Sequence, residues 1–432
     1  PHLGPRLLSS GFVNSFKGNF VCHQQLRKQT LLSPSTNGCC AEIAEIWRER
    51  IDDYCRMKAN TCGYFSLTGY SRTVRKGKPM SYNPIDRAAA FCETYSLQLP
   101  ILMAPMAGAC PASLSIAVAN AGGMGACGCL MMQPEKIINW AQEMRASSNG
   151  VFQLNVWIPD PEPVRDVNNE ADVRKFLGQW GPEVSPEDAE APALNFDAQC
   201  DAMLAVGPNV ISSIMGIYPA PFVVRMKERG IKWFATVTSV TEALAAEAAG
   251  ADVIIAQGLE AGGHRGSFNT EDMSRSLVGL FALLPAVVDA VKVPVVATGG
   301  VADARGVAAA LLLGASAVQI GTGLLRTPEA KIASPWADAI GTSLPEDTVP
   351  TRAFSGRLGR SIRTAYTEAA DKGPIPAPYP IQRNITKAMR TSATDIDRMQ
   401  AWAGQSAGLT RAEPAAELIT DLWSTAKELL NS

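Results

Sequence analysis

The chain of 432 residues is long enough for one large domain or two of ordinary size, with ample sequence for a hydrophobic core. Its 39 Lys and Arg against 41 Asp and Glu give a net charge of −2, which indicates no overall attraction to nucleic acid or to a membrane surface. No run of about eighteen uninterrupted apolar residues occurs, so the sequence also argues against a transmembrane helix.

The amino-terminal segment, residues 1–84, differs from the rest in composition. Residues 1–80 hold twelve Lys and Arg against five Asp and Glu, no acidic residue precedes Glu42, and no period of 3.6 or 2 is sustained. This composition is similar to that of a transit peptide or of translated upstream sequence. We therefore expect residues 1–84 to be a disordered, targeting or artefactual extension, and residues 85–432 to form the main domain.

The ten cysteines all lie at or before Cys200. Their spacings match neither a zinc site nor a small disulfide scaffold, so we expect free thiols and no metal centre. Free thiols are typical of a reducing compartment. The expected location is the cytoplasm, or an organelle if residues 1–84 are a transit peptide.

From Ile85 onward, short apolar runs alternate with helical segments. The runs predict eight strands, at 100–104, 124–130, 151–158, 210–215, 232–238, 252–257, 294–298 and 317–321. Seven helices are expected between them, at 112–121, 135–146, 195–206, 221–229, 241–249, 276–291 and 304–313, with an eighth around 335–340. Eight such units predict a closed (β/α)8 TIM barrel. A doubly wound open sheet competes, but no Gly-x-Gly-x-x-Gly opens the first unit.

Two segments are expected to extend the barrel. Residues 159–192 are rich in Pro, Asp and Glu and follow the third strand, so they should lie over the barrel mouth as an insertion. Such a loop is either a lid or substrate wall, or only a surface insert. The chain after the eighth strand is expected to form a carboxy-terminal extension of helices and loops.

Glycines end the seventh and eighth predicted strands. Gly299 and Gly300 follow the run Val295–Thr298, and Gly321 and Gly323 follow Ala317–Ile320. Backbone amides at such positions, beside a helix start, favour a phosphate, and barrel enzymes commonly bind phosphate after these two strands. The two motifs together predict a phosphorylated cofactor or substrate.

His264 is the one histidine of the main domain, since His2 and His23 lie in the amino-terminal segment. It follows the sixth strand in Gln257-Gly-Leu-Glu-Ala-Gly-Gly-His-Arg-Gly266, where glycines let the backbone approach a ligand closely. Any neutral-pH imidazole chemistry in the barrel must therefore use His264. The alternative is a turn residue without a catalytic role.

Apolar and amide side chains at other strand ends suit a flat ring system. The first strand ends in Ala104-Pro-Met-Ala-Gly108, which could pack beneath such a ring or only pack the rim of the barrel. Asn155 and Gln257 lie near the ends of the third and sixth strands, where their amides could hydrogen-bond the ring edge.

Several motifs together resemble the class I nitronate monooxygenases, also called 2-nitropropane dioxygenase-like flavoproteins. The most specific is Ala256-Gln-Gly-Leu-Glu-Ala-Gly-Gly-His-Arg-Gly266. It is supported, in the order of the family, by Leu102-Met-Ala-Pro-Met-Ala-Gly108, Ala297-Thr-Gly-Gly-Val-Ala-Asp303, Pro378-Tyr-Pro-Ile-Gln382 and Ala401-Trp-Ala-Gly-Gln405. The resemblance covers about residues 85–425 and leaves residues 1–84 unexplained.

The resemblance implies an FMN-dependent barrel without a metal, which oxidises alkyl nitronates such as propionate 3-nitronate with molecular oxygen to a carbonyl compound and nitrite. It implies that His264 is the catalytic imidazole and that Tyr379 faces the substrate. The phosphate of FMN would be held by Gly262, Gly263, Gly299, Gly300, Gly321 and Thr322. The ring and ribityl chain would be lined by Met106, Asn155, Gln257 and Gln319.

The proposed chemistry fits an imidazole. A nitronate is already deprotonated at carbon, so it mainly needs a hydrogen-bond donor or positive charge at the nitro oxygens, whereas a neutral nitroalkane first needs a base. The expected partners are the nitronate and oxygen, with no nucleic acid or membrane, and the sequence does not indicate an oligomeric state. Two other functions stay open: an FMN-dependent NAD(P)H:quinone or enoyl reductase on the same barrel, and a noncatalytic flavin- or phosphate-binding protein.

Overall fold

The computed structural model describes residues 83–432 except 149, 191–193 and 271–272. The prediction for residues 1–84 therefore lies outside the described residues, apart from Asn83 and Pro84. Helix α3 (Pro84–Tyr95) begins at this point, where the Asn83 side chain accepts a hydrogen bond from the amide of Ile85 and so caps the helix.

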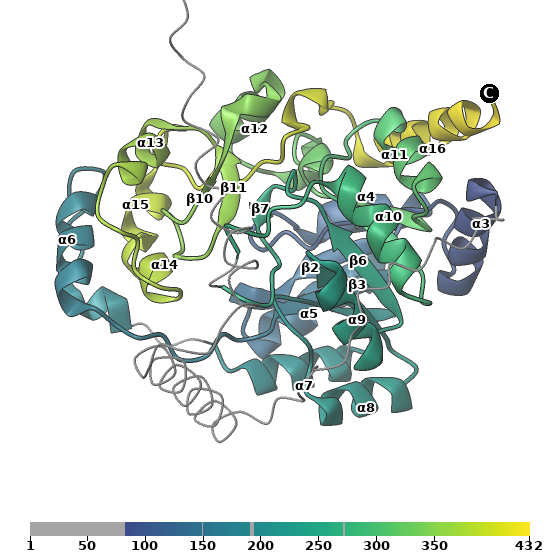
Figure 1. Ribbon diagram of the computed structural model, residues 1–432, viewed down its shortest axis with the longest axis horizontal. Coiled ribbons are helices and arrows are strands. Elements are labelled where there is room, and N and C mark those ends of the chain that lie inside the picture. The colour runs from purple at the N-terminus through teal and green to yellow at the C-terminus, as the bar shows by residue number, and fades with distance from the viewer. Residues whose placement is uncertain (1–82, 149, 191–193, 271–272) are drawn as a thin grey trace, which may run out of the picture. The chain divides into compact units, whose positions relative to one another are not determined.

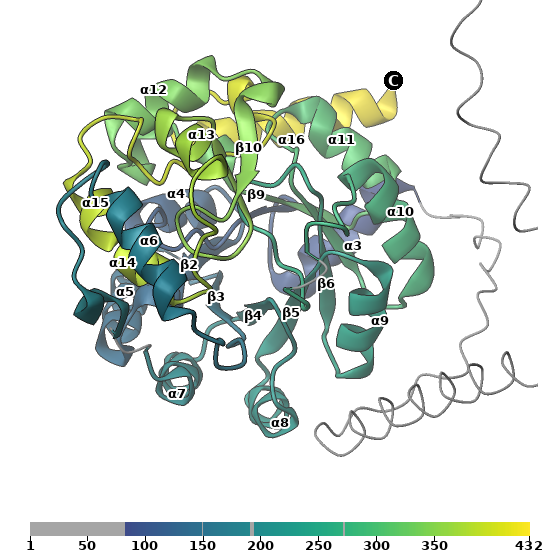
Figure 2. The ribbon, with the colours of Figure 1, turned by 60° about the vertical axis from the view of Figure 1, so that its left-hand side comes forward.

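Eight parallel strands of the described chain form the barrel (Figures 1 and 2). They run in the order β1-β9-β8-β6-β5-β4-β3-β2, and a bridge between Leu102 and Met124 joins the two end strands. The prediction of a closed (β/α)8 TIM barrel is confirmed. The strands are β1 (Ile101–Met103), β2 (Gly125–Gly128), β3 (Phe152–Trp157), β4 (Val210–Ile214), β5 (Lys232–Val237), β6 (Val253–Gln257), β8 (Val295–Thr298) and β9 (Ala317–Ile320).

Helices on the outside of the barrel link the strands, and their starts are set by local capping. The Asp303 carboxylate, for example, accepts a hydrogen bond from the amide of Gly306 at the start of α11. The helices expected between the strands are all present, but α10 begins at Leu280 rather than near 276, at the amide that donates to the Glu260 carboxylate. They are α4 (Ala112–Asn120), α5 (Pro134–Ser147), α7 (Phe196–Val206), α8 (Ala220–Glu228), α9 (Val240–Ala248), α10 (Leu280–Ala290) and α11 (Ala304–Leu312).

The last helix of the chain occupies the eighth place in the barrel wall. Helix α16 (Ala415–Asn431) packs against α11 and α4 through the buried side chains of Leu418, Ile419 and Leu422. The helix predicted around 335–340 exists as α12 (Ser334–Thr342), but it packs on the short helix η6 (Ala407–Leu409) instead. Figures 1 and 2 show α16 beside α11, with α12 set apart from it.

Helix α3 packs against the end of the barrel core where the strands begin. Phe91, Tyr95 and Leu97 belong to one buried cluster with residues of the strands, and the Tyr95 ring lies 5.0 Å from that of Phe234, edge to face. Apolar side chains thus fill this end of the barrel, where the strands begin.

The insertion after β3 and the carboxy-terminal extension form a second hydrophobic core. Its side chains include Val173 and Leu177 of α6 (Val167–Leu177) and Phe354, Tyr366 and Ile385 of the extension. Figure 2 shows α6 beside α14. The extension contributes β10 (Thr348–Thr351), β11 (Gly359–Ile362), α13 (Ala365–Asp371), α14 (Ile381–Ile385) and α15 (Lys387–Ser392), and short helices are η1 (Cys129–Met131), η2 (Pro186–Glu190), η3 (Thr322–Leu324), η4 (Pro328–Ala330) and η5 (Pro345–Asp347).

The strand β7 (Gly263–His264) ties the barrel to this second core, because it pairs antiparallel with β11, which pairs with β10. The five cysteines within the described residues are free and buried: Cys92, Cys110, Cys127, Cys129 and Cys200. None of the described helices has the length and apolar character of a membrane span.

Candidate active site

A cavity of about 340 Å³ opens where the barrel strands end. It is lined by strand ends, by the segment around β7 and by the extension, so three distant parts of the chain build it. His264 and all the residues expected to bind a cofactor line it: Met106, Asn155, Gln257, Gly262, Gly263, Gly299, Gly300, Gln319, Gly321 and Thr322. Tyr379 is not among the described residues that line the cavity.

One part of the cavity offers free backbone amides. The N–H groups of Gly299, Gly300 and Gly321 donate no hydrogen bond within the described part of the chain. Gly299 and Gly300 have φ of 97° and 72°, a conformation that side chains disfavour, so glycine is needed there. Unpaired amides at the ends of β8 and β9 suit a phosphate.

Gly262 and Thr322 also hold the extension against the barrel. The Thr322 hydroxyl oxygen accepts a hydrogen bond of 3.0 Å from the amide of Gly404. A Cβ on Gly262 would lie 2.5 Å from the Gly404 nitrogen, so any side chain there would push the extension away. By contrast, a Cβ on Gly263 would meet no atom within 4 Å, although its φ of 73° still favours glycine.

The amide side chains lining the cavity are only partly satisfied by the protein. Asn155 Nδ2 donates to Ser212 Oγ at 3.0 Å, and Gln319 Oε1 accepts from Gln153 Nε2 at 3.1 Å. This leaves Asn155 Oδ1 and Gln319 Nε2 without a partner among the described residues. At least one acceptor and one donor therefore remain for a ligand.

Gln257 has a structural task as well. Its Nε2 donates to the carbonyl of His264 at 3.1 Å, and its Oε1 accepts from the amide of Gly266 at 2.8 Å. Both ends of the amide thus fix the loop that carries His264. One N–H of Nε2 and one lone pair of Oε1 remain for a ligand, so the expected interaction between this side chain and a flavin stays a prediction.

His264 lies between two tryptophans. Its ring centre is 4.6 Å from that of Trp157 and 4.8 Å from that of Trp402, both nearly edge to face. Burial, followed by the charges of Arg357, Arg383 and Arg390, lowers the pKa of His264 to about 3. The imidazole is therefore neutral near pH 7.

Ser355 orients the imidazole. Ser355 Oγ lies 2.7 Å from His264 Nε2 and 3.2 Å from the carbonyl oxygen of Arg357. The hydroxyl has one hydrogen for these two acceptors. When it goes to the carbonyl, His264 must donate from Nε2, and its Nδ1 lone pair is then free to accept a proton.

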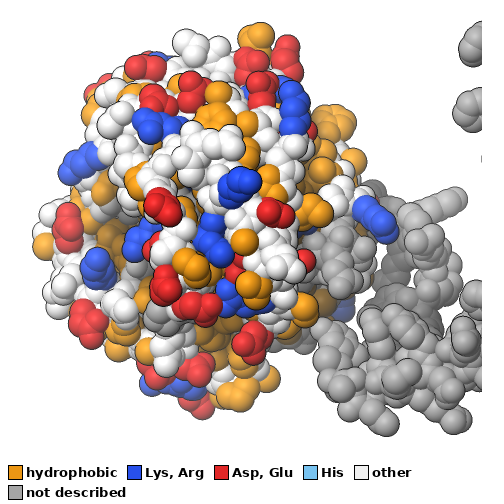
Figure 3. All heavy atoms as spheres, turned by 90° about the vertical axis from the view of Figure 1, so that its left-hand side faces the viewer, with side chains coloured by type: hydrophobic (Ala, Val, Ile, Leu, Met, Phe, Trp, Pro, Cys, Tyr) orange, Lys and Arg blue, Asp and Glu red, His pale blue; other side chains and the backbone are white. Residues whose placement is uncertain are grey.

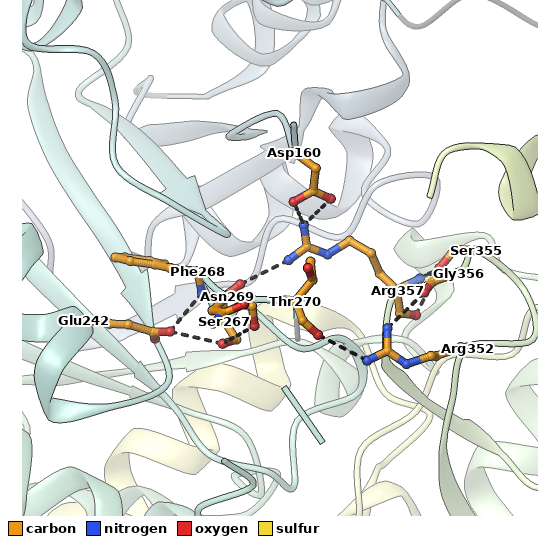
Figure 4. Close-up of polar contacts among 10 residues, drawn as sticks. All are labelled: Asp160, Glu242, Ser267, Phe268, Asn269, Thr270, Arg352, Ser355, Gly356 and Arg357. Atoms are coloured by element: carbon orange, nitrogen blue, oxygen red, sulfur yellow. Dashed lines mark hydrogen bonds and ion pairs between the residues drawn. The ribbon is translucent and has the colours of Figure 1, made fainter. Parts of the chain in front are cut away.

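Arginine side chains hold the turn that carries Ser355 (Figure 4). The buried Arg357 guanidinium pairs with Asp160, at the start of the insertion, and donates to the carbonyl of Ser267. Arg352 donates to the carbonyls of Gly356 and Thr270. The turn is thus fixed from the insertion and from the segment after β7.

Several residues of the site were not expected from the sequence. Trp157 follows Asn155 by two positions, so strand alternation could have placed it on the same face. No local sequence pattern places Ser355 or Arg383 at the site. Trp402 belongs to one of the family motifs, but no role was predicted for it. Tyr379 packs on Trp157 with ring centres 5.4 Å apart, so it lies behind the wall of the cavity.

A closed barrel with a mouth cavity, free glycine amides and a half-buried neutral histidine defines a TIM-barrel enzyme. Residues 90–425 match the nitronate monooxygenase family. A probable nitronate monooxygenase of Staphylococcus aureus is 34% identical over 346 residues, which are 78% of this chain and 96% of that protein. The chain therefore belongs to the nitronate monooxygenase family and is an oxidoreductase.

Two solved structures are similar to this chain over the same residues of the main domain. A nitroalkane oxidase from Streptomyces ansochromogenes has a TM-score of 0.72 and 33% identity, covering 78% of this chain and 98% of that one. FabK from Thermotoga maritima has a TM-score of 0.63 and 28% identity, covering 79% and 97%. The likeness to known relatives extends through the whole main domain.

Proposed function

We propose that this protein oxidises alkyl nitronates with molecular oxygen to a carbonyl compound and nitrite, using noncovalently bound FMN. The observation that carries the proposal is the arrangement of one cavity in a member of this family: free amides of Gly299, Gly300 and Gly321 in one part of its lining, and neutral His264 in another. Residues 85–432 form the catalytic domain in this proposal.

The lining fits FMN. The free glycine amides would hold the phosphate, and Met106 with Ala104 and Pro105 offers an apolar surface for the ring. Asn155 Oδ1 and Gln319 Nε2 would meet polar atoms of the ring or ribityl chain. Bound FMN supplies the redox chemistry, by accepting electrons from the substrate and passing them to oxygen.

The protein itself binds and orients the substrate. Trp157 and Trp402 restrict the position of the imidazole and reduce the access of water to it. His264 meets the nitro group as a hydrogen-bond donor or, for a neutral nitroalkane, accepts the carbon-bound proton. Because its pKa is lowered to about 3, His264 is a weak base in the free protein, which favours preformed nitronates over nitroalkanes.

Anaerobic mixing of the purified protein with propionate 3-nitronate tests the proposal. We expect a yellow protein whose flavin absorbance bleaches on mixing and returns with oxygen, with release of nitrite. Bleaching by NAD(P)H but not by the nitronate would replace the proposal with a reductase. A bound flavin that neither compound reduces would indicate a noncatalytic binding protein.

A further inference from the structure

A chain of hydrogen bonds below the cavity fixes the orientation of the Gln319 amide. Gln153 Nε2 donates to the backbone carbonyl of Met103 at 3.0 Å and to Gln319 Oε1 at 3.1 Å. Gln319 lines the cavity, whereas Gln153 is not among the described residues that do. The bonds therefore connect the backbone of β1, through a side chain of β3, to a side chain of β9 that faces the cavity.

Gln153 lies one layer deeper in the barrel than the cavity. It belongs to β3, where Gln153, Asn155 and Trp157 follow each other at intervals of two residues and so share the inner face of the strand. Asn155 and Trp157 line the cavity, and Gln153 lies beneath them with 0% exposure. A side chain in this layer acts on a ligand in the cavity through the side chains above it.

A group of invariable polarity sets the direction of this chain of bonds. The Met103 carbonyl oxygen only accepts, so Gln153 must turn Nε2 toward it. The same Nε2 meets Gln319, which must offer Oε1, because two donors that face each other form no bond. This orientation is kept although it leaves the buried Oε1 of Gln153 without a partner among the described residues. Gln319 therefore presents its Nε2, a donor, to the cavity.

The other two side-chain amides expected to contact a cofactor are held differently. Asn155 Nδ2 donates to Ser212 Oγ at 3.0 Å, but a hydroxyl both donates and accepts, so this bond does not fix which end of the Asn155 amide faces the cavity. Gln257 uses both ends of its amide to hold its own loop. Of these three amides, Gln319 alone has one free end of defined polarity.

Charged groups are scarce around this amide. Among the described residues that line the cavity, Arg383 is the sole Lys, Arg, Asp or Glu. On the outer side that carries α6 and the extension, Lys and Arg side chains are interspersed with Asp and Glu (Figure 3), so this side presents no field of a single sign. The polarity of the lining thus depends largely on neutral groups, whose orientation is decided by hydrogen bonds such as that from Gln153.

We propose that Gln153 is a positioning residue that makes Gln319 a hydrogen-bond donor to the flavin ring and thereby favours the reduced flavin. This inference rests on the proposed function, because it requires bound FMN. Uptake of two electrons and one proton gives the ring a negative charge, so a fixed N–H beside its oxygen and nitrogen acceptors stabilises the reduced ring more than the oxidised one. A ribityl hydroxyl would not sense this polarity, since it both donates and accepts.

The midpoint potential of the bound flavin, measured by spectroelectrochemistry, tests the proposal in a double-mutant cycle. Gln319→Met removes the donor and should lower the preference for reduced over oxidised FMN by roughly tenfold, which is about 30 mV for a two-electron couple. Gln153→Met leaves the Gln319 amide free to turn over and should lower the preference by about 2- to 10-fold. In a protein that already carries Gln319→Met, Gln153→Met should cause no further change.

Gln382→Met is the matched control. Gln382 is similarly buried, and its amide bonds the backbone of Ala353 and Ala377, neither of which is among the described residues that line the cavity. Its loss should leave the midpoint potential unchanged, even where the melting temperature falls. An equal shift from Gln153→Met with and without Gln319 would show that Gln153 acts through general packing, and no shift in either protein would show that the Gln319 amide does not meet the ring. Either result overturns the proposal.

Titration keeps the test decisive for variants that lose FMN during purification. The apoprotein is titrated with oxidised and with dithionite-reduced FMN, because the ratio of the two Kd values is the same preference. If this ratio depends on Gln153 through Gln319 but no nitronate is oxidised, the proposed function fails and the inference stands. If nitronates are oxidised and the ratio is independent of Gln153, the inference alone fails. Wild-type protein that binds no flavin would refute both.

Discussion

His264 Nε2 lies 2.7 Å from Ser355 Oγ, although 91 positions separate the two residues in the chain. The contact joins the loop after β6 to the extension, and the pairing of β7 with β11 brings the two segments together. The reactivity of the imidazole therefore depends on a part of the protein outside the barrel.

Replacing Ser355 by alanine should lower turnover of a neutral nitroalkane by about 2- to 12-fold, since one hydrogen bond that orients His264 is lost. Ser361→Ala is a suitable control, because Ser361 is equally buried and donates to the carbonyl of Ala401 without touching His264. Steady-state kinetics with both variants would check this. Equal turnover in the two variants would show that Ser355 does not position the base.

The His264→Asn substitution should separate two reactions. A placed base contributes about 10²- to 10⁴-fold, so turnover of a neutral nitroalkane should fall by roughly that factor. The preformed nitronate should lose much less, because asparagine still donates a hydrogen bond. Flavin content should stay the same, since in the proposed binding mode backbone amides hold the phosphate. A wild-type rate of nitroalkane turnover in this variant would show that His264 is not the base.

A carboxylate at Gly321 should abolish retention of FMN. Gly321 has φ of −108°, so aspartate causes no left-handed strain there, but its charge would repel a phosphate at the free amides. Gly178→Asp adds the same group at the end of α6, away from the cavity, and should keep its flavin. The ratio of flavin to protein absorbance measures both. Full flavin occupancy in Gly321→Asp would show that the phosphate binds elsewhere.

The pH dependence should show no titration of His264 near neutrality. Its folded pKa of about 3 lies below the ordinary value of 6.5, so the imidazole stays neutral from about pH 5 to 8. We expect kcat/KM for a preformed nitronate to be flat over that range. The unfolded chain binds this proton more readily, so His264 should reduce stability as the pH falls from 6.5 toward 3. A midpoint near 6.5 in kcat/KM would contradict the lowered pKa.

Two truncations test the start of the catalytic domain. Removing residues 1–82 keeps the Asn83 cap and α3, so melting temperature and flavin content should change little. Removing residues 1–95 also deletes Phe91 and Tyr95 from the core beneath the barrel and should lower the melting temperature strongly. A large fall in melting temperature on removal of residues 1–82 alone would show that these residues stabilise the barrel.

The local pattern of apolar runs and glycines was sufficient to predict the barrel and many of the residues at its mouth. Runs such as Val253–Gln257 are buried along their length, because helices cover one side of a barrel strand and the core fills the other. In the sequence, each strand is therefore a short apolar run, and helical segments separate these runs. Glycines at the ends of β8 and β9 pointed to the cavity because parallel strands bring their carboxyl ends together.

Long-range packing decided the rest. Nothing near 415–431 indicates that α16 rather than α12 completes the wall, because both are amphipathic helices and only packing on α11 and α4 selects between them. Arg383 and Trp402 reach the cavity, and Ser355 reaches His264, through the extension, which local periodicity does not locate. The protonation state of His264 follows from these contacts, since burial and the neighbouring arginine charges lower its pKa, which residue type alone does not do.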